Sequence, residues 1–430
     1  MRVAVYTLGC KVNQYESQFL CERFSERGHD IVSHTETADA YIVNSCTVTS
    51  TSDSKSKKMV GHFRKMNEDA VIALIGCFPQ AFPHKAYEVK AADIVLGNKE
   101  KGRVVELCEK CFDDKKRREA VVEECLPAQF EKMRISRFDE RTRAFVKIQD
   151  GCNRFCSYCI IPKARGRICS RPIEEIVEEI TTLAANGYSE IVLVGIDLSS
   201  YGKQFSKTLT DAVEAVSKIE GVKRIRLGSL EPEIISDEDL KRLSKIDKFC
   251  PQFHLSLQSG CDKTLKRMNR HYTCDEYRKI VEKIRASFEN SSITTDVMVG
   301  FAGESDEDFK DSLEFVKSIG FLKVHVFPYS IRKGTRAAEF TDHIDGEIKK
   351  KRAKIMLSET EKIRKQILKN SIGKTVEVLV ESRVKSGCAF GYTKDYIPVF
   401  VKDCALPVGS FCTVKIDGVE EDGCSASSLN

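Results

Sequence analysis

The chain has 430 residues, of which 41% are hydrophobic and 31% charged, and its formal net charge is +5. These values are typical of a soluble globular protein of two or three domains. No apolar run is long enough to cross a bilayer, and the N-terminus lacks the apolar stretch of a signal peptide. We therefore expect a cytoplasmic protein with no membrane partner, in which the 18 cysteines are reduced and available to metals.

The first segment alternates short apolar runs with helical stretches, which predicts a parallel α/β domain of the Rossmann or flavodoxin-like kind over residues 1–112. The expected strands cover residues 3–7, 40–44, 71–75 and 94–96. Helices are expected at 13–28, 53–66 and 100–110.

Three cysteines, Cys10, Cys46 and Cys77, each follow one of these apolar strands. Because the carboxyl ends of parallel strands meet at one edge of a sheet, the three thiols should converge there. Three thiolates would hold an iron–sulfur cluster and leave one iron open. The alternative is that they are buried free cysteines, which are common in protein interiors.

Residues 113–137 are highly charged and are expected to connect the domains, and a second domain is expected over 138–368. Its apolar strands are predicted near 144–148, 190–195, 223–228, 252–257, 294–299 and 323–327. Helices are predicted at 173–187, 209–218, 237–246, 275–288 and 305–319. Six β/α units of this kind predict a partial barrel, with its chemistry on the loops that follow the strands.

The loop after the first of these strands carries Cys152, Cys156 and Cys159, in the spacing C-x-x-x-C-x-x-C. Four thiolates would complete a 4Fe–4S cluster or a structural zinc site. Three thiolates leave one iron open to a small chelating ligand, so the spacing indicates chemistry rather than a structural staple. A zinc knuckle with a distant fourth ligand is the alternative.

The last segment, residues 370–430, begins after a basic helix near 347–370 that could track phosphates or be a solvated amphipathic helix. Apolar residues then alternate with polar ones over 374–417, which predicts a small antiparallel β-barrel of about five strands. The tail from Glu420 is expected to be frayed. Phe390, Tyr392 and Tyr396 could stack on nucleic-acid bases or belong to the barrel core.

Taken together, these motifs resemble the methylthiotransferases among the radical S-adenosylmethionine (SAM) enzymes. The resemblance covers nearly the whole chain, and its motifs lie at residues 7–17, 44–49, 75–77, 151–159, 254–260 and 268–270. The C-terminal barrel resembles a TRAM domain, which is an RNA-binding module. Residues 10–15 are most similar to the branch that modifies N6-threonylcarbamoyladenosine in tRNA.

The resemblance implies two 4Fe–4S clusters, one held by Cys152, Cys156 and Cys159 and the other by Cys10, Cys46 and Cys77. It also implies SAM as cofactor, a tRNA anticodon stem-loop as substrate, and a reductant such as flavodoxin or ferredoxin. We expect a monomer. Alternative substrates within the family are isopentenyladenosine in tRNA and an aspartate of a ribosomal protein. A non-enzymatic iron–sulfur protein that binds RNA and senses redox state is the alternative from another class.

Residues at the strand ends are candidates for holding SAM, although local ion pairs and packing compete with that role. The candidates are Tyr158, Gly195, Ser229, Glu231, Gln258, Ser259 and Arg270. Arg165 and Arg167 follow the cysteine loop and could meet tRNA phosphates or lie on a solvated surface.

Overall fold

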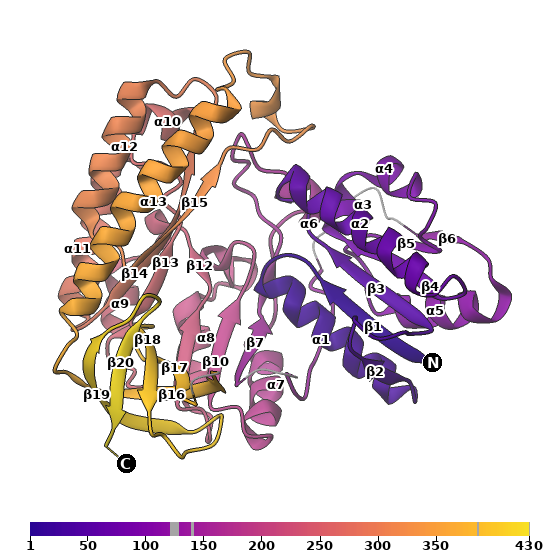
Figure 1. Ribbon diagram of the computed structural model, residues 1–430, viewed down its shortest axis with the longest axis horizontal. Helices are drawn as coiled ribbons and strands as arrows, with labels where there is room; N and C mark the ends of the chain where they lie inside the picture. The colour runs from indigo at the N-terminus through magenta and orange to yellow at the C-terminus, as the bar shows by residue number, and fades with distance from the viewer. Residues whose placement is uncertain (121–128, 139–141, 385–386, 430) are drawn as a thin grey trace.

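The computed structural model describes residues 1–120, 129–138, 142–384 and 387–429. Three parts follow one another along the chain: a parallel sheet with its helices, a central open barrel and a small closed barrel (Figure 1). This order of parts confirms the fold class predicted from the sequence. Within the described residues, no helix is long and apolar enough to span a membrane.

The N-terminal sheet has six parallel strands in the order β2-β1-β3-β4-β5-β6. The strands are β1 (Arg2–Thr7), β2 (Asp30–Val32), β3 (Ala40–Ser45), β4 (Val71–Gly76), β5 (Ile94–Leu96) and β6 (Arg118–Ala120). Every residue of β3 and β4 is buried, as expected for central strands that are covered on both faces. The strand order is flavodoxin-like, and its direction reverses between β1 and β3, where open α/β sheets bind ligands.

Helices cover both faces of this sheet. They are α1 (Lys11–Glu26), α2 (Ser50–Met66), α3 (Cys77–Ala81), α4 (Pro83–Tyr87) and α5 (Arg103–Asp114). In β3, Ile42 packs in the same apolar cluster as residues of α1 and α5, whereas its neighbour Tyr41 packs with residues of α2. β6 extends the sheet into the segment 113–137, and residues 121–128 of that segment lie outside the described residues.

The central part is an open barrel whose parallel strands follow in chain order. Its strands are β7 (Arg143–Lys147), β10 (Glu190–Val194), β11 (Arg224–Leu227), β12 (Ser229–Leu230), β13 (Gln252–Leu255), β14 (Ser292–Val299) and β15 (Lys323–Pro328). The third predicted strand is interrupted at Gly228, so that β11 pairs with β10 while β12 pairs with β13. A short antiparallel pair, β8 (Gln149–Asp150) and β9 (Cys169–Ser170), closes the base of the cysteine loop.

Helices connect the strands of this part, and the five predicted from the sequence are among them. They are α6 (Ile161–Arg165), α7 (Ile173–Ala185), α8 (Leu209–Ser217), α9 (Asp237–Leu243), α10 (Asp262–Arg267), α11 (Cys274–Ser287), α12 (Asp306–Ile319) and α13 (Gly346–Lys369). Capping boxes start α8, α9, α11 and α12, since each N-cap hydroxyl accepts from the backbone N–H of an acidic residue three positions later. These caps fix where each helix begins after its loop.

The C-terminal part is a closed five-stranded barrel in the order β16-β17-β18-β20-β19. Its strands are β16 (Thr375–Arg383), β17 (Ala389–Thr393), β18 (Pro398–Lys402), β19 (Phe411–Val419) and β20 (Cys424–Ser428). The prediction of a frayed tail from Glu420 is wrong, because β20 pairs with both β18 and β19 and buries Cys424 and Ala426. Its inward residues are small, so the tail lacks the strong apolar alternation that marks a strand.

Buried arginines attach this barrel to the central part. Arg226 donates to the carbonyl oxygens of Thr393 (2.8 Å) and Lys394 (2.9 Å), and its Nε donates to Glu190 (2.7 Å). Arg224 likewise donates to the carbonyl oxygen of Tyr392 (3.1 Å). The closed barrel is therefore held against β11 of the central part.

Candidate active site

The first cysteine triplet, Cys10, Cys46 and Cys77, lies at the carboxyl ends of β1, β3 and β4. Gly9 has φ +124°, and a Cβ there would lie 3.1 Å from the Cβ of Cys46, so glycine allows the two loops to approach. The three thiols influence one another, since Cys77 raises the pKa of both Cys10 and Cys46. The structure therefore brings together the three cysteines that strand topology predicted to converge.

Burial is the main cause of the raised pKa of Cys10, and it raises the pKa of Cys46 to about 11. Cys10 is accessible from a cavity, yet the protein atoms around it still desolvate its thiolate. In the absence of a metal these thiols are protonated at neutral pH. Metal binding would favour the thiolates and release the protons.

Polar groups surround the first triplet. Asn98 donates through Nδ2 to Cys77 Sγ (3.3 Å), and Asn13 Oδ1 lies 3.4 Å from Cys10 Sγ. Among the described residues, Asn98 Oδ1, Asn44 Oδ1 and Arg165 Nε are buried without a hydrogen-bond partner. Unused donors and acceptors beside three thiols fit a group that is larger and more charged than the thiols themselves.

A buried ionic cluster, the Glu16 cluster, lies behind the triplet at the junction of the N-terminal and central parts. Its members are Glu16, Lys101, Lys147, Asp150 and Arg165. Glu16 accepts from Arg165 (2.5 Å) and Lys147 (2.8 Å) and also pairs with Lys101. Burial raises the pKa of nearby Glu131 more than the charges of Lys147 and Lys101 lower it. Charges of both signs therefore meet behind the triplet.

Arg165 links this cluster to the thiols. Its Nη2 donates to Asn13 Oδ1 (2.9 Å), and Cys77 and Glu16 together hold the Arg165 pKa well above its usual range despite burial. The prediction that Arg165 meets phosphate or solvent is wrong, because its side chain is fully buried. Arg167 is exposed, with its guanidinium 5.0 Å from the ring centre of Phe155.

The second triplet, Cys152, Cys156 and Cys159, lies in the single loop between β8 and α6. Gly151 has φ +73°, and a Cβ there would lie 1.9 Å from the carbonyl oxygen of Arg167, so the loop can fold back only with glycine. The Cys159 N–H donates to the Cys156 carbonyl (3.0 Å), which forms a tight turn. Burial raises the pKa of Cys152, and it raises that of Cys159 to about 12.

Arg270 and Glu231, two of the predicted SAM-binding residues, lie beside this triplet. Arg270 donates to Cys156 Sγ (3.3 Å) and to the carbonyl oxygen of Ser256 (3.1 Å), and it forms an ion pair with Glu231. Burial raises the Glu231 pKa more than Arg270 lowers it. Tyr158, between two of the cysteines, packs edge-on against Phe301 with ring centres 6.3 Å apart.

The other four candidates are spread over the barrel rim. Gly195 and Ser229 line a large cavity, and Gly195 is packed so that a Cβ would lie 2.8 Å from Gln149 Oε1. Gln258 has φ +67°, and its backbone joins β13 to β14 through Asp296 and Met298. Ser259 is buried and does not line the cavity. Its hydroxyl accepts from the Cys261 N–H (3.3 Å), a hydrogen bond that holds the loop.

Asp197 was missed by the sequence analysis. It is buried after β10, its Oδ1 has no hydrogen-bond partner among the described residues, and its charge contributes to the raised Cys152 pKa. Asn98, beside Cys77, was missed too. Both lie within three residues of the end of an apolar strand, so the rule that marked the cysteines could have marked them.

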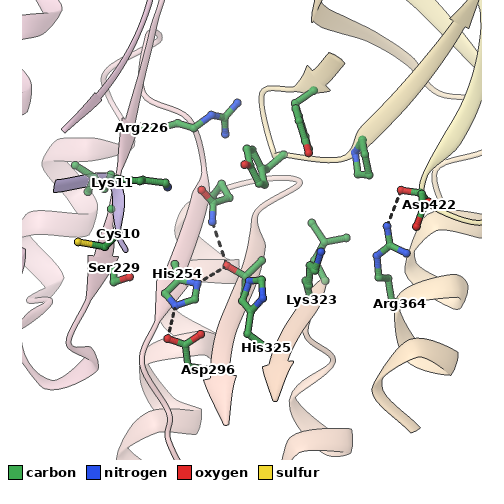
Figure 2. Close-up of a pocket in the computed structure, with 18 of the residues that line it drawn as sticks. Cys10, Lys11, Arg226, Ser229, His254, Asp296, Lys323, His325, Arg364 and Asp422 are labelled. Atoms are coloured by element: carbon green, nitrogen blue, oxygen red, sulfur yellow. Dashed lines mark hydrogen bonds and ion pairs between the residues drawn. The ribbon is translucent and has the colours of Figure 1, made fainter. Parts of the chain in front are cut away.

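A cavity of about 970 Å³ lies where the three parts meet. Figure 2 shows Cys10 and Lys11 on one side and barrel residues including Ser229, His254 and His325 below and opposite. This volume lies at the upper end of the range of pockets that enclose drug-sized ligands.

Aromatic side chains of the C-terminal barrel line the same cavity. They are Phe390, Tyr392, Tyr396 and Phe400. Tyr392 and Tyr396 stack with ring centres 4.4 Å apart, and the guanidinium of Arg143 lies 5.2 Å from the Tyr392 ring. Phe390, Tyr392 and Tyr396 are half-buried residues that face the cavity and do not belong to the apolar cluster of the barrel core.

His254, Asp296 and His325 form a trio on the cavity wall, with potential ligand atoms within 4.8 Å of one another. His254 Nε2 lies 3.4 Å from Asp296 Oδ2, and its Nδ1 lies 3.0 Å from Thr294 Oγ1. His254 thus has the polar partners expected of a structural histidine.

Three family models match successive parts of the chain. Residues 2–97 match the uncharacterized protein family UPF0004, 146–316 the radical SAM superfamily and 369–422 the TRAM domain. The threonylcarbamoyladenosine tRNA methylthiotransferase MtaB of Bacillus subtilis is 35% identical over 423 residues, which cover 96% of this chain and 93% of that protein. The chain belongs to the methylthiotransferase family. Its match to the MtaB of Thermotoga maritima is 37% identical and covers 98% and 95% of the two chains.

This methylthiotransferase is also similar to the tRNA-2-methylthio-N(6)-dimethylallyladenosine synthase of Alkaliphilus oremlandii, at 34% identity over 99% of this chain and 91% of that protein. Among solved structures, the radical SAM methyltransferase TsrM from Kitasatospora setae aligns with a TM-score of 0.55 at 13% identity, over 76% of this chain and 72% of that one. OxsB, a cobalamin-dependent radical SAM enzyme, aligns at 0.51 and 12% identity, over 84% and 57%. These two likenesses show the fold alone.

Proposed function

We propose that this methylthiotransferase adds a methylthio group to carbon two of N6-threonylcarbamoyladenosine, next to the anticodon of tRNA. The observation that carries the proposal is that one cavity brings Cys10 of the first triplet together with the inside of the central barrel and with aromatic residues of the TRAM barrel. Cys10 of the first triplet lines the cavity directly. Gly195 and Ser229 line it too. Asp197, two residues after Gly195, contributes to the raised pKa of Cys152. Glu231, two residues after Ser229, pairs with Arg270, which donates to Cys156 Sγ.

The cofactors of the family are SAM and 4Fe–4S clusters. Cys152, Cys156 and Cys159 would hold one cluster, and Cys10, Cys46 and Cys77 would hold the other. Each set supplies three thiolates, and the buried Arg165 guanidinium and the unused polar atoms beside Cys77 fit an anionic sulfur site. When bound, these groups supply the radical that removes hydrogen from carbon two and the sulfur and methyl group that replace it.

The chain's own residues would position SAM beside the second triplet. The Arg270 guanidinium can pair with the SAM carboxylate, and Glu231 can accept from its amino group or ribose. Gly195, Ser229 and Gln258 would contribute contacts from the rim, with Tyr158 near the adenine and Ser259 holding the loop. Burial around the triplet keeps water away from reactive species.

The TRAM barrel and α13 would hold the tRNA. Tyr392 and Tyr396 present a stacked pair to the cavity on which a base can stack. Arg364 and Lys365 of α13 line the cavity, where they can meet phosphates. The protein would act as a cytoplasmic monomer, away from membranes, with electrons from a small carrier such as flavodoxin or ferredoxin.

Anaerobically reconstituted protein, SAM and a reductant, incubated with an anticodon stem-loop that contains threonylcarbamoyladenosine, test the proposal directly. Mass spectrometry of the digested RNA should detect the methylthio nucleoside. Product only from the isopentenyl stem-loop would move the assignment to the activity named for the Alkaliphilus relative. Absence of 5′-deoxyadenosine under every condition would favour a non-enzymatic iron–sulfur RNA-binding protein.

A further inference from the structure

The charges that line the cavity are unevenly matched. Arg226 is paired with Glu190 (2.7 Å), and Arg364 with Glu361 (3.0 Å). Lys11 and Lys323 also line the cavity, and within the described parts of the chain neither has a carboxylate at ion-pair distance. The Lys11 ammonium lies 5.7 Å from the centre of the Phe145 ring, a contact that does not neutralise it. Within the described residues, Lys11 and Lys323 are therefore cavity cations with no carboxylate at ion-pair distance, although Asp296, Glu361, Glu421 and Asp422 line the same cavity.

Lys11 has a defined place relative to the first triplet. It is the first residue of α1 and follows Cys10 directly, and both residues line the cavity. The first turn of α1 contains no acidic residue that would offset its charge. Figure 2 shows the Lys11 side chain directed into the cavity, toward the side on which His325 lies.

His325 provides a second polar group. It is an exposed residue of β15 that lines the cavity, and it shares a strand face with Lys323, two residues earlier. Burial lowers the pKa of His325, and the nearby charges of Lys323 and Lys11 lower it further. Asp296 of β14 and His254 of β13 lie near it, with potential ligand atoms within 4.8 Å of one another.

The N6 substituent of threonylcarbamoyladenosine ends in a carboxylate and a hydroxyl, whereas an isopentenyl group is an uncharged hydrocarbon. Carbon two and the N6 substituent lie on one edge of adenine, on either side of a single ring nitrogen. A base whose carbon two faces the Cys10 triplet therefore brings its N6 substituent close to the residue that follows Cys10. An ammonium without a partner in a partly enclosed cavity suits a carboxylate.

We propose that Lys11 binds the carboxylate of the threonylcarbamoyl group, with His325 as a second donor, and so selects this nucleoside over uncharged N6 substituents. This inference rests on the proposed function. An uncharged substituent would leave the Lys11 ammonium without a partner, and the site would reject it for that reason. The competing role for Lys11 is to offset negative charge at the first triplet.

The test compares two anticodon stem-loops, one with threonylcarbamoyladenosine and one whose carboxylate is replaced by a primary alcohol. For the wild-type holoenzyme, we expect kcat/KM to be about 10-fold to 100-fold lower with the alcohol. Lys11→Met should have the same low kcat/KM with both stem-loops. His325→Asn should lower kcat/KM for the natural stem-loop by about 2-fold to 10-fold. Fluorescence anisotropy of labelled stem-loops should show the same pattern in Kd.

Lys317→Met, at an exposed lysine of α12 that pairs with Glu314, is the matched control and should behave as wild type. Iron content and 5′-deoxyadenosine formation of Lys11→Met should also match wild type. The proposal would be overturned if Lys11→Met lowered kcat/KM by the same factor on both stem-loops. It would also be overturned if the wild type had the same kcat/KM on both, a comparison that needs no variant. Failure of the proposed function would look different, because the wild type would then leave the natural stem-loop unmodified.

Discussion

The two cysteine triplets differ in how the fold assembles them. Cys152, Cys156 and Cys159 share one loop, and their geometry depends on local features such as the left-handed Gly151. Cys10, Cys46 and Cys77 come from three strand ends, and only the order of the parallel sheet brings them together. The second site can therefore form wherever its loop folds, whereas the first requires the whole N-terminal sheet and its junction with the barrel.

Their surroundings differ in the same way. The loop triplet contacts the Arg270–Glu231 pair at the barrel rim, next to the predicted SAM site. The strand-end triplet lies against the Glu16 cluster, in which both parts of the protein contribute charges. From this contrast we expect separable chemistry at the two sites and different sensitivity to changes at the domain junction.

Replacing each triplet with alanine should give the largest and most different effects. Cys152/156/159→Ala should abolish 5′-deoxyadenosine formation from SAM, because no open iron remains to bind SAM. Cys10/46/77→Ala should still cleave SAM but form no methylthio product. Chromatography of 5′-deoxyadenosine and the methylthio nucleoside from the same reaction measures both activities. Loss of SAM cleavage in both variants would show that the sites do not act separately.

Glu16→Gln should weaken the strand-end site through the junction. It removes the carboxylate that pairs with Arg165, Lys147 and Lys101, so we expect the free energy of unfolding to fall by about 3–5 kcal/mol. Denaturant unfolding measures this, with Glu36→Gln as control, because its exposed pair with Arg2 should contribute less than about 1 kcal/mol. Equal small losses in both variants would contradict a structural role for the Glu16 cluster.

Thiol reactivity in the metal-free protein should follow the raised pKa values. Because the pKa of Cys46 is about 11 and that of Cys159 about 12, the thiolate fraction of each should rise about tenfold per pH unit, or about 100-fold from pH 7 to 9. Peptide mapping after timed iodoacetamide labelling measures both rates. A plateau at pH 8–9 at either cysteine would show that burial does not hold its pKa up.

Arg270→Lys should have the smallest effect. The lysine keeps the positive charge beside Glu231 but loses the forked contacts to Cys156 and the Ser256 carbonyl. We expect the KM for SAM to rise about tenfold, while the amount of bound iron stays unchanged. An unchanged KM would remove Arg270 from the SAM site, and a loss of iron would give it a structural role instead.

The sequence predicts the fold well where the pattern is strong. Buried strands such as β3 and β4 are continuous apolar runs, and the six β/α units of the barrel repeat regularly, so both α/β parts follow from periodicity. β20 escapes prediction because it is short and its inward residues are Cys424 and Ala426, which carry little apolar signal. Its place depends on pairing with both β18 and β19 in the closed barrel.

At the site, the convergence of Cys10, Cys46 and Cys77 follows from strand ends alone. The Glu16 cluster does not, because its lysines and arginine look like surface residues until two parts of the protein meet around them. For the same reason Arg165 is misassigned to phosphate or solvent. That Lys11 has no carboxylate at ion-pair distance within the described residues also cannot be predicted from the sequence, because it depends on which carboxylates the fold brings near.

The central claim is that the chain holds two separate three-thiolate sites. Iron and sulfide analysis of the anaerobically reconstituted protein, combined with Mössbauer spectroscopy, tests it most directly. We predict about eight irons per chain in the wild type and about four in both Cys10/46/77→Ala and Cys152/156/159→Ala. A wild type with about four irons, or a Cys10/46/77→Ala variant that keeps the full wild-type amount, would contradict the account.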